Sequence, residues 1–122
     1  MQDGWIGVDL DGTLAKYEKW TGDPFSIGDP VPKMVERVKQ WLREGQQVWI
    51  VTARVNFEDR YGSDASPAMQ SQVRESIDKW CLLHIGVALP VTYKKNYSMI
   101  ELWDDRCVQV IPNTGERADG QT

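Results

Sequence analysis

The sequence has little of what zinc-binding, disulfide-bonded and membrane proteins contain. It has one histidine and two cysteines. Cys81 and Cys107 share no metal-ligand spacing with His84, so we expect free thiols in a reducing compartment. The N-terminus has no basic leader, and no apolar run is long enough for a signal peptide or a membrane span. These shortages favour a cytoplasmic protein with no membrane partner.

Excess positive charge is also missing. Fourteen Lys and Arg residues against eighteen Asp and Glu residues give a formal net charge of −4. General nucleic-acid binders usually show a basic footprint, so this class is disfavoured, although a local basic pocket is not excluded. The 122 residues suit one domain with one core. We assign residues 1–112 to that domain and expect the polar residues 113–122 to form a loose tail.

Strand and helix patterns alternate along the chain. Apolar runs predict buried strands at residues 5–10 and 48–52, with a helix over 31–45 between them. The apolar stripe of that helix is Met34, Val35, Val38, Trp41 and Leu42. After a polar loop at 55–65, Ser66 and Pro67 predict the start of a second helix. Its stripe is Val73, Ile77, Trp80, Cys81 and His84.

Three further segments have strand character. Residues 88–95 contain a weak candidate, residues 98–105 a stronger one, and residues 107–112 a short final one. The order strand, helix, strand, helix, strand, strand predicts an α/β fold. Its most economical form is a three-layer, Rossmann-like parallel sheet with helices on both faces.

Acidic side chains stand where two of the predicted strands end. Asp9 and Asp11 occur in "VDLDGTL", and Asp104 and Asp105 in "LWDD". Ligands of open parallel sheets bind at the carboxyl ends of the strands, so we expect these acids to meet. Four neighbouring carboxylates repel one another and become stable around a cation. An all-oxygen ligand set selects Mg²⁺ before Ca²⁺.

A hydroxyl and a lysine complete this set. Thr52 ends the second strand, and Lys94 and Lys95 follow the third. A metal, a hydroxyl and a cation are the parts that phosphoryl transfer needs. Aspartate can supply the nucleophile through an aspartyl phosphate. If the chain turns after Leu10, as Gly12 permits, one acid can attack phosphorus while the other handles the leaving-group proton.

Taken in order, "DLDGTL", "VTAR", a lysine and "LWDD" resemble the motifs of the haloacid dehalogenase-like (HAD) superfamily of aspartate-nucleophile phosphohydrolases. The resemblance covers residues 9 to 105. It implies that Asp9 is the nucleophile and a Mg²⁺ ligand. It further implies that Asp11 is the general acid/base and binds the metal through its backbone carbonyl. Asp104 then binds Mg²⁺ directly, and Asp105 binds it directly or through water.

The same resemblance implies a phosphate-binding set. Thr52 would hydrogen-bond the transferring phosphoryl group, and Lys95 would pair with the nucleophile and the phosphoryl charge. Lys94 is the alternative, but Lys95 fits the family's spacing to Asp104 slightly better. The full set implied for phosphate binding is Thr52, Lys95, Leu10 and Ala53.

No segment has room for a cap domain of the kind that HAD enzymes often insert after their first or second motif. Only 40 residues separate Asp11 from Thr52, and the predicted helix uses many of them. The chain therefore resembles small capless members carried by phages and prophages. Substrate contacts should come from loops, and the candidates are Arg54, Trp20, Asn56 and Lys94. An open site suits a bulky substrate or one covered by a partner subunit, so a homo-oligomer is one expected assembly.

The sequence thus predicts a Mg²⁺-dependent phosphomonoester hydrolase. Its substrate is left open among nucleotides, sugar phosphates, nucleic-acid ends and phosphoproteins, with a nucleotide or a nucleic-acid end slightly favoured. A catalytically degenerate HAD-fold binding module is the main alternative. A phospho-receiver domain is disfavoured because its acceptor aspartate lies on a middle strand, where this chain has "VTAR". A phosphotransferase is disfavoured because no cap excludes water.

Overall fold

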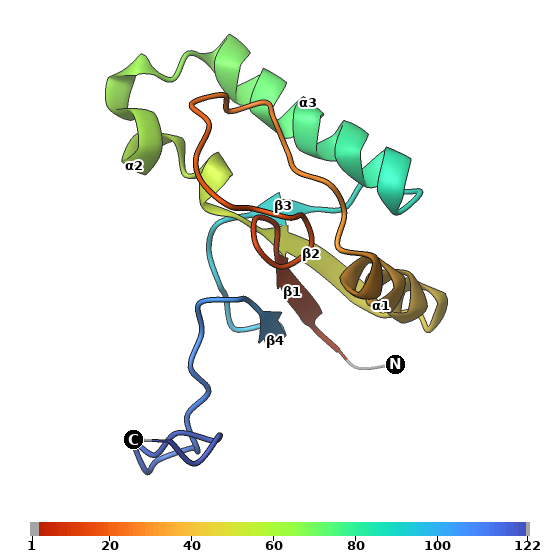
Figure 1. Cartoon of the computed structure of the whole chain (residues 1–122), viewed down its shortest axis with the longest axis vertical. Helices are drawn as coiled ribbons and strands as arrows, with labels where there is room; N and C mark the ends of the chain where they lie inside the picture. The colour runs from red at the N-terminus through yellow and green to blue at the C-terminus, as the bar shows by residue number, and fades with distance from the viewer. Residues whose placement is uncertain (1–2, 122) are drawn as a thin grey trace.

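The computed structural model describes residues 3–121 and contains a four-stranded sheet whose strands are all parallel (Figure 1). The strands, in chain order, are β1 (Trp5–Asp9), β2 (Gln47–Val51), β3 (Val91–Thr92) and β4 (Met99–Trp103). Their order across the sheet is β3-β2-β1-β4. Apolar runs bounded by loops form the two central strands, as the sequence predicts. The predicted α/β fold with a parallel sheet is confirmed.

Two long helices connect the strands. Helix α1 (Pro32–Arg43) links β1 to β2, and helix α3 (Pro67–His84) lies between β2 and β3. Each begins with proline in its first turn, where the missing N–H costs nothing. Ser66 also caps α3, since its hydroxyl accepts the Met69 N–H at 3.1 Å. The predicted helix starts are therefore correct to within one residue.

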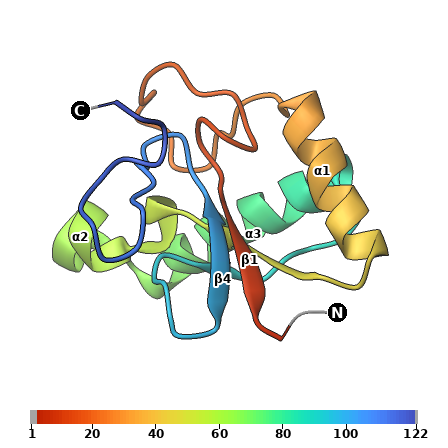
Figure 2. The ribbon, with the colours of Figure 1, turned by 90° about the horizontal axis from the view of Figure 1, so that it is seen from below.

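Both helices cover the same face of the sheet. Their buried side chains form one core cluster with alternate residues of the central strands, namely Ile6, Val8, Val48 and Ile50. Alternate side chains of a strand point to opposite faces, so α1 and α3 lie on one side. In Figure 2, β1 and β4 lie in front and α3 lies behind them.

No helix described in residues 3–121 covers the opposite face. Trp5 and Trp49 stack there with ring centroids 5.0 Å apart. The Trp5 indole N–H donates to Asn96 at 3.0 Å, within the connection 93–98 that joins β3 to β4. Parallel crossovers usually need a dozen or more residues and carry a helix, for which this connection is too short. The second helical layer expected from the sequence is therefore not among the described elements.

The predicted polar loop at 55–65 is wrong, because these residues form short helices. Helix α2 (Phe57–Tyr61) lies between two 3₁₀ turns, η1 (Ala53–Val55) and η2 (Gly62–Asp64). The Asn56 side chain caps α2 by accepting the Asp59 N–H at 3.4 Å. Phe57 is buried in the core cluster, so one apolar side chain anchors an otherwise polar segment.

The predicted final strand at 107–112 is also wrong. The segment after β4 runs away from the sheet (Figure 1) and folds back on itself through an isolated bridge between Val110 and Arg117. The Ala118 N–H donates to the Gln109 carbonyl at 2.9 Å. Alternating apolar residues suggest a strand, but this segment pairs with no neighbour in the sheet. The loose tail at 113–122 stays a prediction, and Thr122 lies outside the described residues.

No helix among residues 3–121 is both long enough and apolar enough to cross a membrane.

The packing of α3 gives a direct test of the core. Ile77→Ala should lower the free energy of unfolding by about 2–4 kcal/mol, because Ile77 is fully buried and its loss leaves a cavity. Leu83→Ala, on the same helix but 78% exposed, should change it by less than about 0.5 kcal/mol. Urea unfolding measures both values. Equal losses at the two positions would contradict the orientation of α3.

Candidate active site

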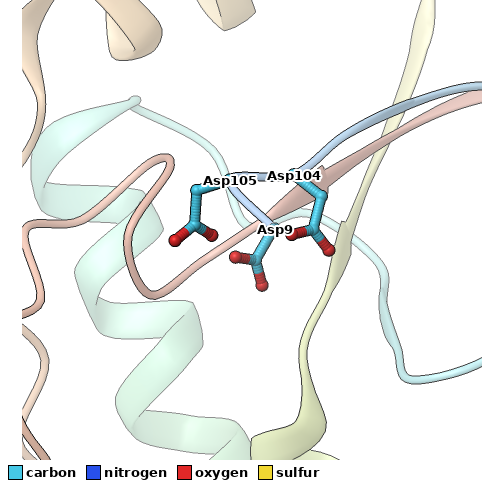
Figure 3. A group of neighbouring side chains, drawn as sticks. All are labelled: Asp9, Asp104 and Asp105. Atoms are coloured by element: carbon cyan, nitrogen blue, oxygen red, sulfur yellow. The ribbon is translucent and has the colours of Figure 1, made fainter. Parts of the chain in front are cut away.

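Three carboxyl groups meet at the carboxyl ends of β1 and β4 (Figure 3). Asp9 is the last residue of β1, and Asp104 and Asp105 directly follow β4. The two strands are neighbours, with Val8 opposite Trp103, so their ends place these acids side by side. One oxygen from each residue lies within 4.8 Å of the other two. The structure therefore brings together three of the four acids that the sequence singles out.

Crowding and burial change the chemistry of Asp9. Burial is the main cause that raises its pKa from 3.8 to about 8. A hydrogen bond with Asp105 and the negative charges of Asp104, Asp105 and Asp11 raise it further. In the chain alone, the Asp9 carboxyl thus keeps a proton at neutral pH. A divalent cation can replace that proton, and the all-oxygen donor set fits Mg²⁺.

The turn after β1 is shaped around Asp105. Gly12 has a φ of 92°, a conformation that side-chain-bearing residues rarely adopt. A Cβ at this position would lie 2.6 Å from Oδ2 of Asp105. The Thr13 hydroxyl accepts the Asp105 N–H at 3.1 Å and donates to Oδ1 at 3.4 Å. The "DGT" sequence therefore turns the chain and also orients an acid from β4.

Asp11 stands apart from this group and pairs with Arg54. Nε and Nη2 of Arg54 donate to the two Asp11 carboxylate oxygens at 2.7 and 2.9 Å. The Arg54 side chain is only 5% exposed, and its Nη1 donates to the Pro24 carbonyl at 3.1 Å. The sequence leaves Arg54 open between a substrate contact and a structural ion-pair residue. The ion pair is present, with a partner 43 residues away that no local pattern indicates, and the substrate contact stays a prediction.

A cavity of about 280 Å³ opens beside both groups of acids. Thr52, Ala53 and Asn56 line it, as a phosphate or substrate site requires. Thr52 is 3% exposed, and its Oγ1 accepts the Arg54 N–H at 3.2 Å. A hydroxyl that accepts one hydrogen bond can still donate another, so Thr52 suits an anion in the cavity.

The lysines do not line this cavity. Lys94 and Lys95 lie exposed in the connection after β3, and the Lys94 ammonium is 5.2 Å from the Tyr93 ring centroid. The cations along the cavity are arginines, Arg54 together with Arg60 and Arg106. Arg106 is not among the residues that the sequence predicts for the site, although its position directly after "DD" is a signal for it.

Two other predicted residues lie beside the cavity rather than along it. Leu10 is fully buried in the core, so only its backbone can face a ligand. Trp20 lies under two guanidinium groups, with its ring centroid 5.4 Å from Cζ of Arg54 and 4.6 Å from Cζ of Arg60. Cation–π contacts of this kind hold the loop that carries Trp20 against the site.

The raised pKa of Asp9 makes the stability of the metal-free protein depend on pH. The unfolded chain ionises Asp9 above about pH 4, whereas the folded chain keeps its proton up to about pH 8. Asp9 therefore lowers stability progressively as pH rises across this window. In EDTA at pH 8, Asp9→Asn should raise the free energy of unfolding by about 1–2 kcal/mol, a value reduced for partial exposure.

Urea unfolding at pH 5 and pH 8 measures this effect. Asp64→Asn, at an exposed acid outside the cluster, is the control and should follow the parent at both pH values. An Asp9→Asn variant whose stability falls with pH as steeply as that of the parent would contradict the protonation of Asp9 in the folded chain.

Comparison with known proteins supports the fold. No family model and no curated protein matches the chain. Among solved structures, it is similar to a conserved protein from Bacteroides thetaiotaomicron, with 21% sequence identity and a TM-score of 0.56. The match covers 92% of this chain and 84% of that one. At this identity the likeness shows a shared fold over nearly the whole length, and the fold alone.

Proposed function

We propose that the protein is a Mg²⁺-dependent phosphomonoester hydrolase of the HAD type, without a cap domain. One observation carries the proposal. Asp9 lies in a group with Asp104 and Asp105, and Asp11 is held separately by Arg54, while Asp9, Asp11 and Asp104 all line the cavity. Two carboxyl groups in such different surroundings suit two different roles, a nucleophile and a proton carrier.

The carboxylates of Asp9, Asp104 and Asp105 would hold the metal ion, together with the backbone carbonyl of Asp11 that the family resemblance implies. When bound, Mg²⁺ neutralises negative charge on the phosphoryl group and favours the ionised form of Asp9. Thr13 and Gly12 support this arrangement because they fix the position of Asp105.

Asp9 and Asp11 carry the two chemical steps. In the first, an Asp9 oxygen forms a bond to phosphorus while the bond to the leaving group breaks. The electron pair stays on the leaving oxygen, which takes a proton from Asp11. The Asp11 oxygens can carry that proton on the lone pairs that do not accept from Arg54. In the second, Asp11 removes a proton from water as the water oxygen attacks phosphorus. The bond to Asp9 then breaks, and inorganic phosphate leaves.

Thr52 and the arginines would stabilise the transferring group. The Thr52 hydroxyl donates to a phosphoryl oxygen, and Arg106 and Arg60 supply positive charge along the cavity. We assign the cation role to them rather than to Lys95, because Lys95 is exposed and is not among the lining residues. Tyr17 and Tyr93 add two aromatic rings to the lining. Rings and arginines together favour a nucleotide or a phosphorylated nucleic-acid end as substrate.

The open cavity favours hydrolysis over transfer to another acceptor. Between Asp11 and Thr52 the chain forms one loop, α1 and β2, and between Thr52 and Lys94 it forms short helices, α3 and β3. Intervals made of so few elements support a site without a cap, to which water would have access. The free thiols of Cys81 and Cys107 are consistent with a cytoplasmic setting for the reaction.

A phosphate-binding module without catalysis is the second candidate. The observation that favours it is the position of Lys94 and Lys95, which leaves the cavity without the lysine of the family motif.

A phosphatase panel with and without Mg²⁺ separates the two. The parent should hydrolyse phosphomonoesters only with the metal, and Asp9→Asn should lower kcat by about 10³-fold or more, because the nucleophile is lost. Asp64→Asn is the matched control. Metal-independent turnover, or full activity of Asp9→Asn, would contradict the mechanism. Phosphate binding without turnover would support the module.

The choice of cation is tested separately. Arg106→Ala should lower kcat/KM by about tenfold or more, because it removes charge from the cavity lining. Lys95→Ala should change it by less than about threefold. The reverse ranking in steady-state kinetics would restore the lysine to the role that the family resemblance implies.

A further inference from the structure

We infer that Arg54 is a positioning residue that fixes Asp11 and fastens the loop 16–28 over the site. The inference rests on the proposed function, in which Asp11 moves the proton. We call residues 16–28 the flap. Its base is closed by the Lys16 N–H, which donates to the Asp29 carbonyl at 2.7 Å.

The contact between Arg54 and Asp11 fixes the orientation of the Asp11 carboxylate as well as its distance from the guanidinium. Two parallel N–H groups of one planar guanidinium meet both carboxylate oxygens, so the carboxyl cannot rotate without breaking a bond. Misplacing a reacting group by about 1 Å can cost 10²-fold in rate. Lysine carries a similar charge but offers a single ammonium, which cannot reproduce the fork.

The same guanidinium also holds the flap. Its third nitrogen donates to the Pro24 carbonyl at 3.1 Å, and the Trp20 ring lies 5.4 Å from its Cζ. Arg60 approaches the same ring at 4.6 Å. Loss of Arg54 would therefore free Asp11 and loosen the flap together.

The backbone of Arg54 connects its contacts with Asp11 and the flap to Thr52, the proposed phosphate ligand. Arg54 lies in η1, directly after β2, and its N–H donates to the Thr52 hydroxyl oxygen at 3.2 Å. One residue thus joins three parts of the site, which are Thr52, Asp11 and the flap. A rigid element holds it there, since Thr52 follows a central strand of the sheet.

Stability alone does not explain this part-buried pair, in which the side chains of Arg54 and Asp11 are 5% and 21% exposed. Removing charges from water is costly, and apolar replacements of buried ion pairs are often neutral or stabilising. What the pair does provide is a carboxyl held away from Asp9, Asp104 and Asp105. The Asp11 carboxyl is absent from that group of carboxyls although Asp11 is only two residues from Asp9.

Leaving-group dependence tests the positioning role. A p-nitrophenolate leaves without much help from an acid, whereas an alkoxide needs a proton. Arg54→Lys should lower kcat on glycerol 2-phosphate by about 10²-fold but on p-nitrophenyl phosphate by less than about tenfold. In an Asp11→Asn background, Arg54→Lys should add little further loss. Arg43→Lys, at an exposed ion pair on α1, is the matched control and should change neither rate.

Limited trypsin digestion tests the flap without using activity. Cleavage after Lys19, an exposed flap residue, should be about tenfold faster in Arg54→Met than in the parent at equal global stability. Equal kcat losses on both substrates, with unchanged cleavage at Lys19, would overturn the inference and leave a purely structural ion pair. If the parent has no phosphatase activity, the proposed function fails, and the cleavage rate alone decides whether Arg54 holds the flap.

Discussion

Repulsion between carboxylates at the ends of β1 and β4 is the constraint around which the site is built. Asp9 responds by keeping a proton, because burial and its neighbours raise its pKa to about 8. Asp105 is held in place by Thr13 and has room only because residue 12 is glycine. The Asp11 carboxylate lies apart from the other three and accepts hydrogen bonds from Arg54. Each of these arrangements lowers stability or restricts which residue can occupy a position. Together they keep four acids near one cavity.

The short connection between β3 and β4 determines how the face of the sheet opposite α1 and α3 is covered. It crosses to the far edge of the sheet without a helix, so that face is covered by Trp5, Trp49 and the connection itself. The same connection carries Lys94 and Lys95, and it leaves them exposed. The short connection therefore explains two differences from the sequence-based prediction. No helix among residues 3–121 covers this face of the sheet, and neither Lys94 nor Lys95 lines the cavity.

Sequence patterns predicted the features that depend on local rules. The apolar runs before Asp9 and Asp104 identify strands, and parallel strands must bring their carboxyl ends to one edge. The proline starts of α1 and α3 were predicted in the same way. Such patterns cannot indicate which cations reach the cavity, because that depends on side chains far apart in sequence. The pairing of Arg54 with Asp11 is of this kind.

The predictions for residues 107–112 and 55–65 are wrong because the conformation of these segments depends on contacts with the rest of the protein. Residues 107–112 alternate like a strand, but a strand forms only where a partner edge and a covering layer exist. Residues 55–65 are polar overall, yet the Asn56 cap and the buried Phe57 were enough to form helical turns. Composition described the average of each segment, whereas one or two contacts decided its conformation.

The flap is attached mostly through backbone groups. Backbone bonds close its base, and Arg54 donates to the carbonyl of Pro24, a group that every residue possesses. Trp20 is the flap side chain that adds contacts to Arg54 and Arg60. Exchanges of other flap side chains therefore leave these contacts in place, which is a route by which one scaffold can acquire new substrates without rebuilding its chemistry.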